Sequence, residues 1–231
     1  FRWIIENPGT VDLIGFGTAA ALMLLFEWGV MLHDLEAENV IAGKRKWSDI
    51  KGLVKGMWRK AGRQVLKDYV VFPALTGPLF VPTLIGNATA NLVRNVWTYS
   101  IIFCGHFPSG AQTFTSEECQ NETRGQWYLR QMLGSANITG GTLFHIMSGN
   151  LSHQIEHHLF PDIPASRHPE MSAEVQEICE RYGLPYNTGS LSHQLASTWK
   201  KIAKLSLPNW MTRDDNDLTV IVEREKPASV A

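Results

Sequence analysis

Apolar side chains dominate residues 11–32, where only Asp12 and Glu27 carry a charge. An α-helix rises about 1.5 Å per residue, so this stretch is long enough to cross a hydrocarbon core of about 30 Å. We predict a membrane-spanning helix over residues 11–32, in which Glu27 faces protein or the membrane interface because a charge in lipid is costly. A buried helix in a soluble protein is the alternative, since the mean hydropathy of the whole chain is only -0.11.

Residues 33–69 form a charged connector in which apolar positions recur near helical spacing. Its nine basic residues are Lys44, Arg45, Lys46, Lys51, Lys55, Arg59, Lys60, Arg63 and Lys67. A basic amphipathic helix of this kind binds the anionic surface of a membrane. A solvated helix packed against the rest of the protein shows the same pattern, so both interpretations stay open.

A second apolar stretch, residues 70–105, is predicted to be the next membrane segment. Three prolines interrupt its first third: Pro73, Pro78 and Pro82. Proline removes a backbone donor and breaks helices, so we expect irregular structure there and a continuous helix from Thr83.

Three asparagines in that helix recur at every fourth residue: Asn87, Asn91 and Asn95. This spacing places them on one face, which continues to His106 at the end of the apolar stretch. Amides within a membrane need partners, so we predict that this face lines a polar site with His106 at its mouth. A polar seam between packed helices is the alternative.

The remainder of the chain, residues 106–231, is predicted to be a cytosolic part with several short helices. The expected elements are 107–123 (loop), 127–133 (helix), 134–141 (loop), 169–182 (helix) and 191–205 (helix). Proline at the first position and Gly183 just past the end mark the helix over 169–182. Together these elements predict an all-α fold of integral membrane helices and cytosolic helices that carry histidines.

Composition narrows the range of partners. The chain has 21 basic and 22 acidic residues and a formal net charge of -1, so it lacks the positive field of a nucleic-acid-binding protein. Its three cysteines, Cys104, Cys119 and Cys179, have neither the spacing of a zinc site nor the even count of a disulfide framework. A reducing compartment is therefore the expectation.

The strongest chemical signal is the segment 149–161, GNLSHQIEHHLFP, which holds three of the eight histidines. In a helix, Gln154, His157 and His158 share one face. His153 then lies one turn before His157, and the final proline ends the helix. Adjacent helical positions point about 100° apart, so His157 and His158 suit two neighbouring metal ions better than one. Imidazole binds zinc, copper, nickel and iron alike, and purely structural histidines are the alternative.

The motif QIEHH at residues 154–158, followed by LFP, resembles the third histidine box of the membrane fatty acid desaturases. That box has histidine or glutamine, two further residues, and then two histidines. Glutamine in the first position resembles the front-end group and its bacterial acyl-CoA relatives. Other segments resemble bacterial members of the family: NATANLVRNVW (87–97), CGHFP (104–108) and ETRGQWYLRQMLGSAN (122–137). The resemblance extends from about residue 27 to about residue 209.

This resemblance implies two iron ions held by histidines at the cytosolic ends of membrane helices, where they activate dioxygen and remove two hydrogens from a fatty acyl chain. It also implies a fatty acyl-CoA or acyl-lipid substrate and electrons from a ferredoxin- or cytochrome-type donor. His157 and His158 match the iron ligands of the third box, and His106 matches the lone ligand histidine before it. Gln154 stands where other branches have a ligand histidine, and His153 has no counterpart.

The first two histidine boxes of that family are absent from this sequence. We expect them to precede Phe1, and we expect the chain alone to hold an incomplete set of ligands and to be inactive. Two other functions stay open: a lipid hydroxylase with the same iron pair, and a non-catalytic membrane protein whose histidines are structural or bind zinc. Glu156, inside the motif, is expected either to orient a metal-bound histidine or to be a surface charge.

Overall fold

The computed structural model describes residues 13–33, 35, 40, 43–114 and 119–206, and most of them are helical. These residues form two compact units. Residues 17–100 make up the first, which we call the arm unit, and residues 13–16 with 101–206 make up the second, the histidine unit. The predicted all-α class is confirmed in that helices dominate both units.

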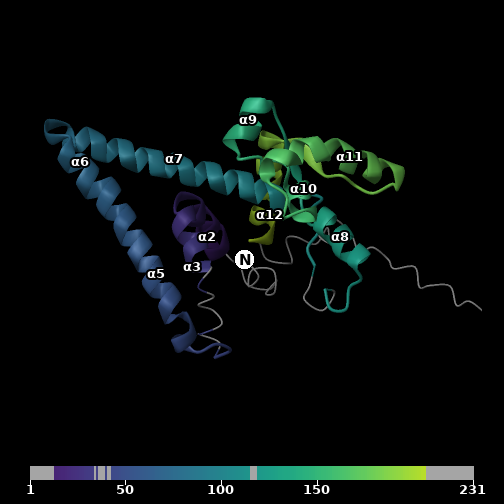
Figure 1. Cartoon of the computed structure of the whole chain (residues 1–231), viewed down its shortest axis with the longest axis horizontal. Helices are drawn as coiled ribbons and strands as arrows, with labels where there is room; N and C mark the ends of the chain where they lie inside the picture. The colour runs from purple at the N-terminus through teal and green to yellow at the C-terminus, as the bar shows by residue number, and fades with distance from the viewer. Residues whose placement is uncertain (1–12, 34, 36–39, 41–42, 115–118, 207–231) are drawn as a thin grey trace, which may run out of the picture. The chain divides into compact units, whose positions relative to one another are not determined.

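The arm unit is helical throughout its described elements. These are most of α2 (Leu13–Leu24), α3 (Phe26–His33), α5 (Trp47–Leu66), the π-helix η1 (Lys67–Val71), α6 (Phe72–Leu75), the 3-10 helix η2 (Gly77–Leu79) and most of α7 (Phe80–His106). Figure 1 shows α5 and α7 leaving α6 in different directions, with α2 and α3 between them. The predicted connector helix and the irregular, proline-rich segment after it are both confirmed.

The asparagine row of α7 holds the arm unit together. Asn87 donates a hydrogen bond to the Asp68 carbonyl at 2.6 Å, and Asn91 donates to the Tyr69 hydroxyl at 2.9 Å. Both partners belong to η1, so these amides join α7 to the end of the connector. The prediction of a polar site along this face is therefore wrong, because helix packing takes up the amides.

The third asparagine of the row, Asn95, sits at a break in the predicted span over residues 11–32. α2 ends at Leu24 and α3 begins at Phe26, and Asn95 Nδ2 donates to the Leu24 carbonyl at 2.9 Å. A side chain thus satisfies a carbonyl at the helix end and allows the helix to stop there. Residues 11 and 12 lie outside the described residues. Across the described ranges, no helix has both the length and the hydropathy that crossing a bilayer requires.

Glu27 faces protein, as its cost in lipid predicts. Its carboxylate accepts a hydrogen bond from Gln64 Nε2 at 2.7 Å and forms an ion pair with Arg94. The charge therefore connects α3 with both α5 and α7 inside the arm unit.

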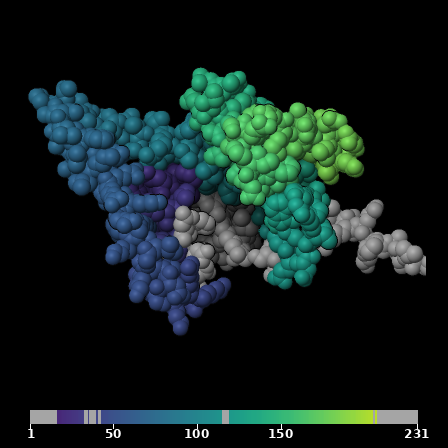
Figure 2. All heavy atoms as spheres, in the orientation of Figure 1, coloured from purple at the N-terminus to yellow at the C-terminus, as the bar shows by residue number. Residues whose placement is uncertain are grey.

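The histidine unit surrounds the segment 149–161 with short elements. These are the last turns of α7, α8 (Arg124–Leu133), β1 (Asn137–Thr139), α9 (Thr142–Met147), α10 (Gln154–Leu159), the 3-10 helix η3 (Ala165–Arg167), α11 (His168–Arg181), β2 (Thr188–Ser190) and α12 (Leu191–Leu205). The two helices predicted over 169–182 and 191–205 are confirmed as α11 and α12. Figure 2 shows α9 projecting from the rest of this unit.

A pair of short parallel strands stands where the sequence predicts only loop. β1 lies within 134–141 and pairs with β2, so that Asn137 is opposite Thr188 and Thr139 is opposite Ser190. The loop prediction is wrong there because a strand is defined by its partner, and this partner is distant in the sequence. The pair places β1 in contact with both α10 and α12.

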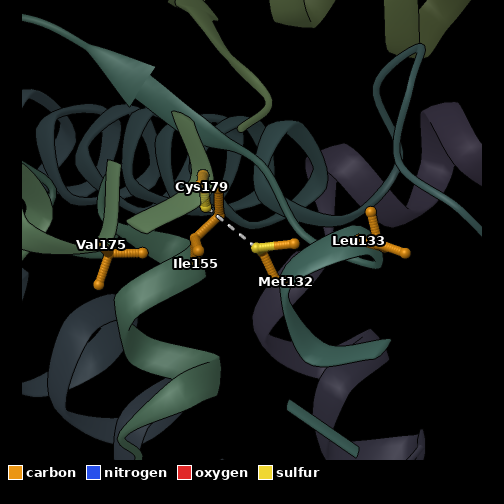
Figure 3. Close-up of a cluster of buried hydrophobic side chains, with 5 residues drawn as sticks. All are labelled: Met132, Leu133, Ile155, Val175 and Cys179. Atoms are coloured by element: carbon orange, nitrogen blue, oxygen red, sulfur yellow. Dashed lines mark hydrogen bonds between the residues drawn. The ribbon is translucent and has the colours of Figure 1, made fainter. Parts of the chain in front are cut away.

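The core of the histidine unit joins α8, α10 and α11. Its buried side chains are Met132, Leu133, Ile155, Val175 and Cys179 (Figure 3). Ile155 of α10 is fully buried, and Cys179 Sγ lies 3.2 Å from Met132 Sδ beside it. Because Ile155 belongs to the QIEHH motif, this core fixes the helix that carries the motif histidines.

Candidate metal centre

The histidine motif forms one short helix. α10 covers only Gln154–Leu159. Gly149 and Asn150 adopt φ of 63° and 59°, a left-handed conformation that a right-handed helix excludes. His153 is the residue that caps α10, with φ of -98° and ψ of 61°. The His157 N–H donates to the His153 carbonyl at 3.0 Å, so the two residues lie one helical turn apart, as predicted.

A close approach between α7 and α10 brings His106 to the motif. A Cβ atom added at Gly105 lies only 2.8 Å from Gln154 Cγ, so glycine is needed for the two helices to come this near. Gln154 Nε2 lies 3.1 Å from His106 Nε2. The His106 ring meets the His158 ring edge-on, with 4.9 Å between their centroids. Three of the four predicted metal-binding side chains are thus in contact.

Replacing Gly105 by alanine is expected to push Gln154 away from His106. The added methyl group overpacks a filled contact, and such changes destabilise proteins by about 1–3 kcal/mol. Thermal unfolding of the purified protein measures this loss, and metal analysis of the same sample shows whether the site is lost with it. Gly125→Ala in α8 is the control, because a Cβ there meets no atom within 4 Å. Equal melting temperatures for the two variants contradict the close approach.

His157 and His158 are adjacent in α10, and their rings diverge as helical spacing requires. Their centroids lie 5.7 Å apart with 77° between the ring planes. His158 Nδ1 lies 3.1 Å from Gln131 Oε1 of α8, so Nδ1–H donates to the amide carbonyl. The other nitrogen, Nε2, keeps its lone pair for a cation. Gln131 thus fixes the tautomer of His158, the kind of role that the sequence assigned to Glu156.

Glu156 is buried in a hydrogen-bond network of its own. Its Oε2 accepts from Asn137 Nδ2 and its Oε1 accepts from the Tyr186 hydroxyl, each at 2.8 Å. Burial and the neighbouring Glu156 raise the pKa of Tyr186, so the hydroxyl stays protonated and donates. His153 Nδ1 lies 3.9 Å from the carboxylate. Both expectations for Glu156 are therefore wrong, because it is neither a surface charge nor bonded to an α10 histidine; it ties α10 to β1.

Two histidines that sequence reasoning missed, His145 and His168, lie beside the motif. The ring centroid of His168 is 5.8 Å from that of His157, and the centroid of His145 is 4.7 Å from that of His153. The sequence carried one signal for them, since five of the eight histidines fall within residues 145–168.

These additional histidines differ in their hydrogen bonds. His145 Nδ1 lies 2.7 Å from Ser152 Oγ and His145 Nε2 lies 2.8 Å from the Gly140 carbonyl, so both of its nitrogens are satisfied. By contrast, within the described part of the chain the ring nitrogens of His153 and His168 are buried without a hydrogen-bond partner. Such unpaired groups cost about 1–3 kcal/mol each, which marks these rings as unusual.

Burial keeps the histidines of this cluster neutral. Desolvation is the main cause that lowers the pKa of His106 and of His153 to about 4, and neighbouring histidines act in the same direction. Desolvation also lowers the pKa of His158 and of His168. At neutral pH these rings are uncharged and offer nitrogen lone pairs, the form in which imidazole binds metal ions.

Acid is expected to destabilise the metal-free protein between about pH 6.5 and about pH 4. In this window the unfolded chain protonates histidine, whose ordinary pKa is about 6.5, while folded His106 and His153 stay neutral. Unfolding then takes up protons, so stability falls as the pH falls, by about 3 kcal/mol for each of the two groups. Urea unfolding with a chelator at about pH 7 and about pH 5 measures the slope. His153→Asn should reduce this dependence of stability on pH, and His193→Asn, at an exposed histidine, should leave it unchanged. Equal stability of the wild-type protein at both pH values contradicts the prediction.

The cluster fits a metal ion in donor type and in the spacing of its pairs. A ring centroid lies about 3.2 Å from a metal bound to that ring, so two rings on one ion have centroids within about 6.5 Å. Four pairs meet this limit: His106–His158, His157–His158, His157–His168 and His145–His153. In the last pair, both nitrogens of His145 already have hydrogen-bond partners. Buried Gln154 Oε1 also lacks a hydrogen-bond partner among the described residues. In the described ranges, no group of three or more His, Cys, Asp or Glu side chains is already arranged to hold a metal ion.

Most of the chain is similar in sequence to known proteins. Residues 15–190 match the family model described as fatty acid desaturase. A protein described as "NADPH-dependent stearoyl-CoA 9-desaturase" from Mycobacterium tuberculosis is 52% identical over 200 residues, which cover 85% of this chain and 47% of that protein. An "Acyl-lipid (7-3)-desaturase" from Rebecca salina is 27% identical over 197 residues, covering 77% and 44%. A "Delta(8)-fatty-acid desaturase 2" from Arabidopsis thaliana is 34% identical over 98 residues, covering 42% and 20%.

The chain spans about half the length of the first two of these relatives. The range that matches the family model contains His106 and the whole QIEHH motif. No solved structure matches the chain.

Proposed function

The chain belongs to the fatty acid desaturase family, and on this premise we propose that the protein containing it introduces a double bond into a fatty acyl chain, with dioxygen as the oxidant. The observation that carries the proposal is the meeting of His106 from α7 with Gln154 and His158 from α10. Residues far apart in the sequence converge there on the motif that resembles the third histidine box.

Two irons are the proposed cofactor, with His106, His157 and His158 among their ligands. When bound, the iron pair supplies the oxidising power to take hydrogen from an unactivated methylene, which no side chain possesses. The chain itself orients one of these ligands, since Gln131 holds the tautomer of His158. Gln154 Nε2 donates to His106 Nε2, so His106 binds iron through that nitrogen only when Gln154, in the position where other branches have a ligand histidine, gives up this hydrogen bond.

The proposed substrate is a fatty acyl-CoA rather than an acyl-lipid. The relative that is 52% identical is named for stearoyl-CoA, whereas the relative named for acyl-lipids is 27% identical. The first name also includes NADPH, so the electrons are proposed to come from NADPH through a ferredoxin- or cytochrome-type donor.

The proposed location is an integral membrane position with the histidines facing the cytosol. Large apolar side chains are exposed from α6 into α7, with 57% to 77% of their surface accessible: Leu75, Leu79, Val81, Ile85 and Val93. Exposed apolar surface of this kind marks contact with lipid or protein. Alkaline extraction of membranes from expressing cells tests the location, and retention in the membrane pellet is the expected result.

Product analysis of the purified, iron-loaded whole protein tests the function. The protein receives stearoyl-CoA, oxygen, NADPH and a reductase with a ferredoxin-type donor, and the acyl products are identified by mass spectrometry. A monounsaturated acyl-CoA is expected, while stearate held in phosphatidylcholine vesicles should remain unchanged. A hydroxylated product would instead identify the protein as a lipid hydroxylase that uses the same iron pair. The absence of product from both substrates overturns the proposal.

A further inference from the structure

His168, the first residue of α11, is a fully buried imidazole with 0% of its surface exposed. Among the described residues neither of its ring nitrogens has a hydrogen-bond partner. The Ile163 carbonyl raises the pKa of His168, and it is the weakest of the influences on that pKa. Its position does not satisfy the geometry of a hydrogen bond to the ring. Burying a polar group without a partner is costly, so a ring with two such nitrogens indicates a group that binds there.

The chain returns sharply from α10 to bring His168 back to the motif. The Arg167 N–H donates to the Pro164 carbonyl at 2.9 Å and closes a tight turn just before α11. Pro169 then stands in the first turn of α11, where its missing N–H removes no helical hydrogen bond. These local constraints set the ring of His168 beside that of His157, 5.8 Å away.

A second set of contacts anchors the start of α11 to α10. Ser172 Oγ, one turn after His168, lies 2.9 Å from the Tyr186 hydroxyl, and that hydroxyl donates to Glu156 at 2.8 Å. Glu156 precedes His157 directly, so a rigid, buried network couples the backbone positions of the two histidines. The pairing of His157 with His168 is thus built into the fold.

We propose that His168 is a further metal ligand, which binds the same ion as His157. This inference rests on the proposed function, because it concerns the iron pair. The centroid distance of 5.8 Å lies within the limit of about 6.5 Å for two rings on one ion. With this assignment, each of the two motif histidines has a neighbouring imidazole that can share its metal ion. His158 is paired with His106, and His157 is paired with His168.

His153 does not offer the same arrangement, although its ring nitrogens also lack partners among the described residues. Its neighbouring ring is that of His145, at 4.7 Å. Both nitrogens of His145 are engaged, with Ser152 and the Gly140 carbonyl, so that pair has no second free nitrogen. His153 is therefore a suitable comparison for His168.

Iron analysis of the purified whole protein carrying His168→Gln tests the inference. We expect one of the two irons to be lost, and the Mössbauer spectrum of the ⁵⁷Fe-loaded variant to change from a coupled pair to an isolated ion. His153→Gln is the matched control, since it also removes a buried ring without partners beside the motif. It should retain both irons. Retention of both irons with an unchanged spectrum in His168→Gln overturns the inference.

His168→Gly separates the loss of a ligand from misfolding. This substitution leaves a ring-sized cavity at the start of α11, and added imidazole is expected to occupy it and restore the missing iron. A purely structural histidine predicts no return of iron, and that result overturns the inference even where His168→Gln does not fold. A failure of the proposed function gives a different result. If the wild-type protein binds both irons but makes no product, the proposed function is wrong while the role of His168 as a ligand still stands. Wild-type protein that binds no iron overturns both.

Discussion

Alanine in place of His158 is expected to abolish acyl-chain desaturation by the whole protein and to release iron. His158 of α10 touches His106 of α7 and is oriented by Gln131, so its loss removes a proposed ligand and the contact with a second proposed ligand. Changing only the partners of metal ligands typically costs 10–100-fold in affinity or activity, so removing the ligand itself should cost more than about 100-fold. His157→Ala is expected to behave in the same way. Acyl products and bound iron are measured on the same preparation.

The control for this experiment is His193→Ala, an exposed histidine of α12 outside the cluster. Thermal unfolding of each variant shows whether the protein is still folded, because loss of activity through unfolding is uninformative. Wild-type levels of product and iron in folded His158→Ala would favour structural histidines. Binding of zinc in place of iron, lost in the variant, would favour a zinc site.

Local patterns in the sequence were sufficient where local physics decides the structure. Proline and glycine at the two ends of α11 define that helix without reference to the rest of the fold. The QIEHH motif pointed to a helix with diverging histidines, and the helix forms over Gln154–Leu159. The convergence of His106 on the motif came from the family resemblance, because no local pattern connects residues so far apart.

Contacts between distant residues account for what the sequence did not reveal. The break after Leu24 coincides with a hydrogen bond from Asn95, far along the chain, and a run of apolar residues gives no hint of it. The role of Glu156 likewise depends on Asn137 and Tyr186, which come from two other segments. His168 reaches His157 only because the connection after α10 turns back, and spacing along the chain does not show this.

Replacing Asn137 by aspartate is expected to destabilise the histidine unit strongly. Asn137 Nδ2 donates to Glu156 at 2.8 Å and to the Tyr186 hydroxyl at 2.6 Å, and its Oδ1 accepts from the Ile155 N–H at 2.9 Å. Aspartate keeps the shape but replaces the donor with an oxygen that faces the Glu156 carboxylate. An unpaired buried charge of this kind typically costs about 3–5 kcal/mol, and we expect iron binding to weaken because α10 loses its anchor.

The pH dependence of this substitution distinguishes charge repulsion from simple loss of packing. At acid pH, protonation of the new carboxyl group restores a donor toward Glu156, so the difference in stability between Asn137→Asp and wild type should narrow. Comparing the variant with wild type at each pH cancels the acid sensitivity of the histidines. Exposed Asn121→Asp is the matched control and should change stability by less than about 0.5 kcal/mol. If the difference in stability between variant and wild type is the same at neutral and acid pH, repulsion between Glu156 and the new carboxylate is not the cause of the destabilisation.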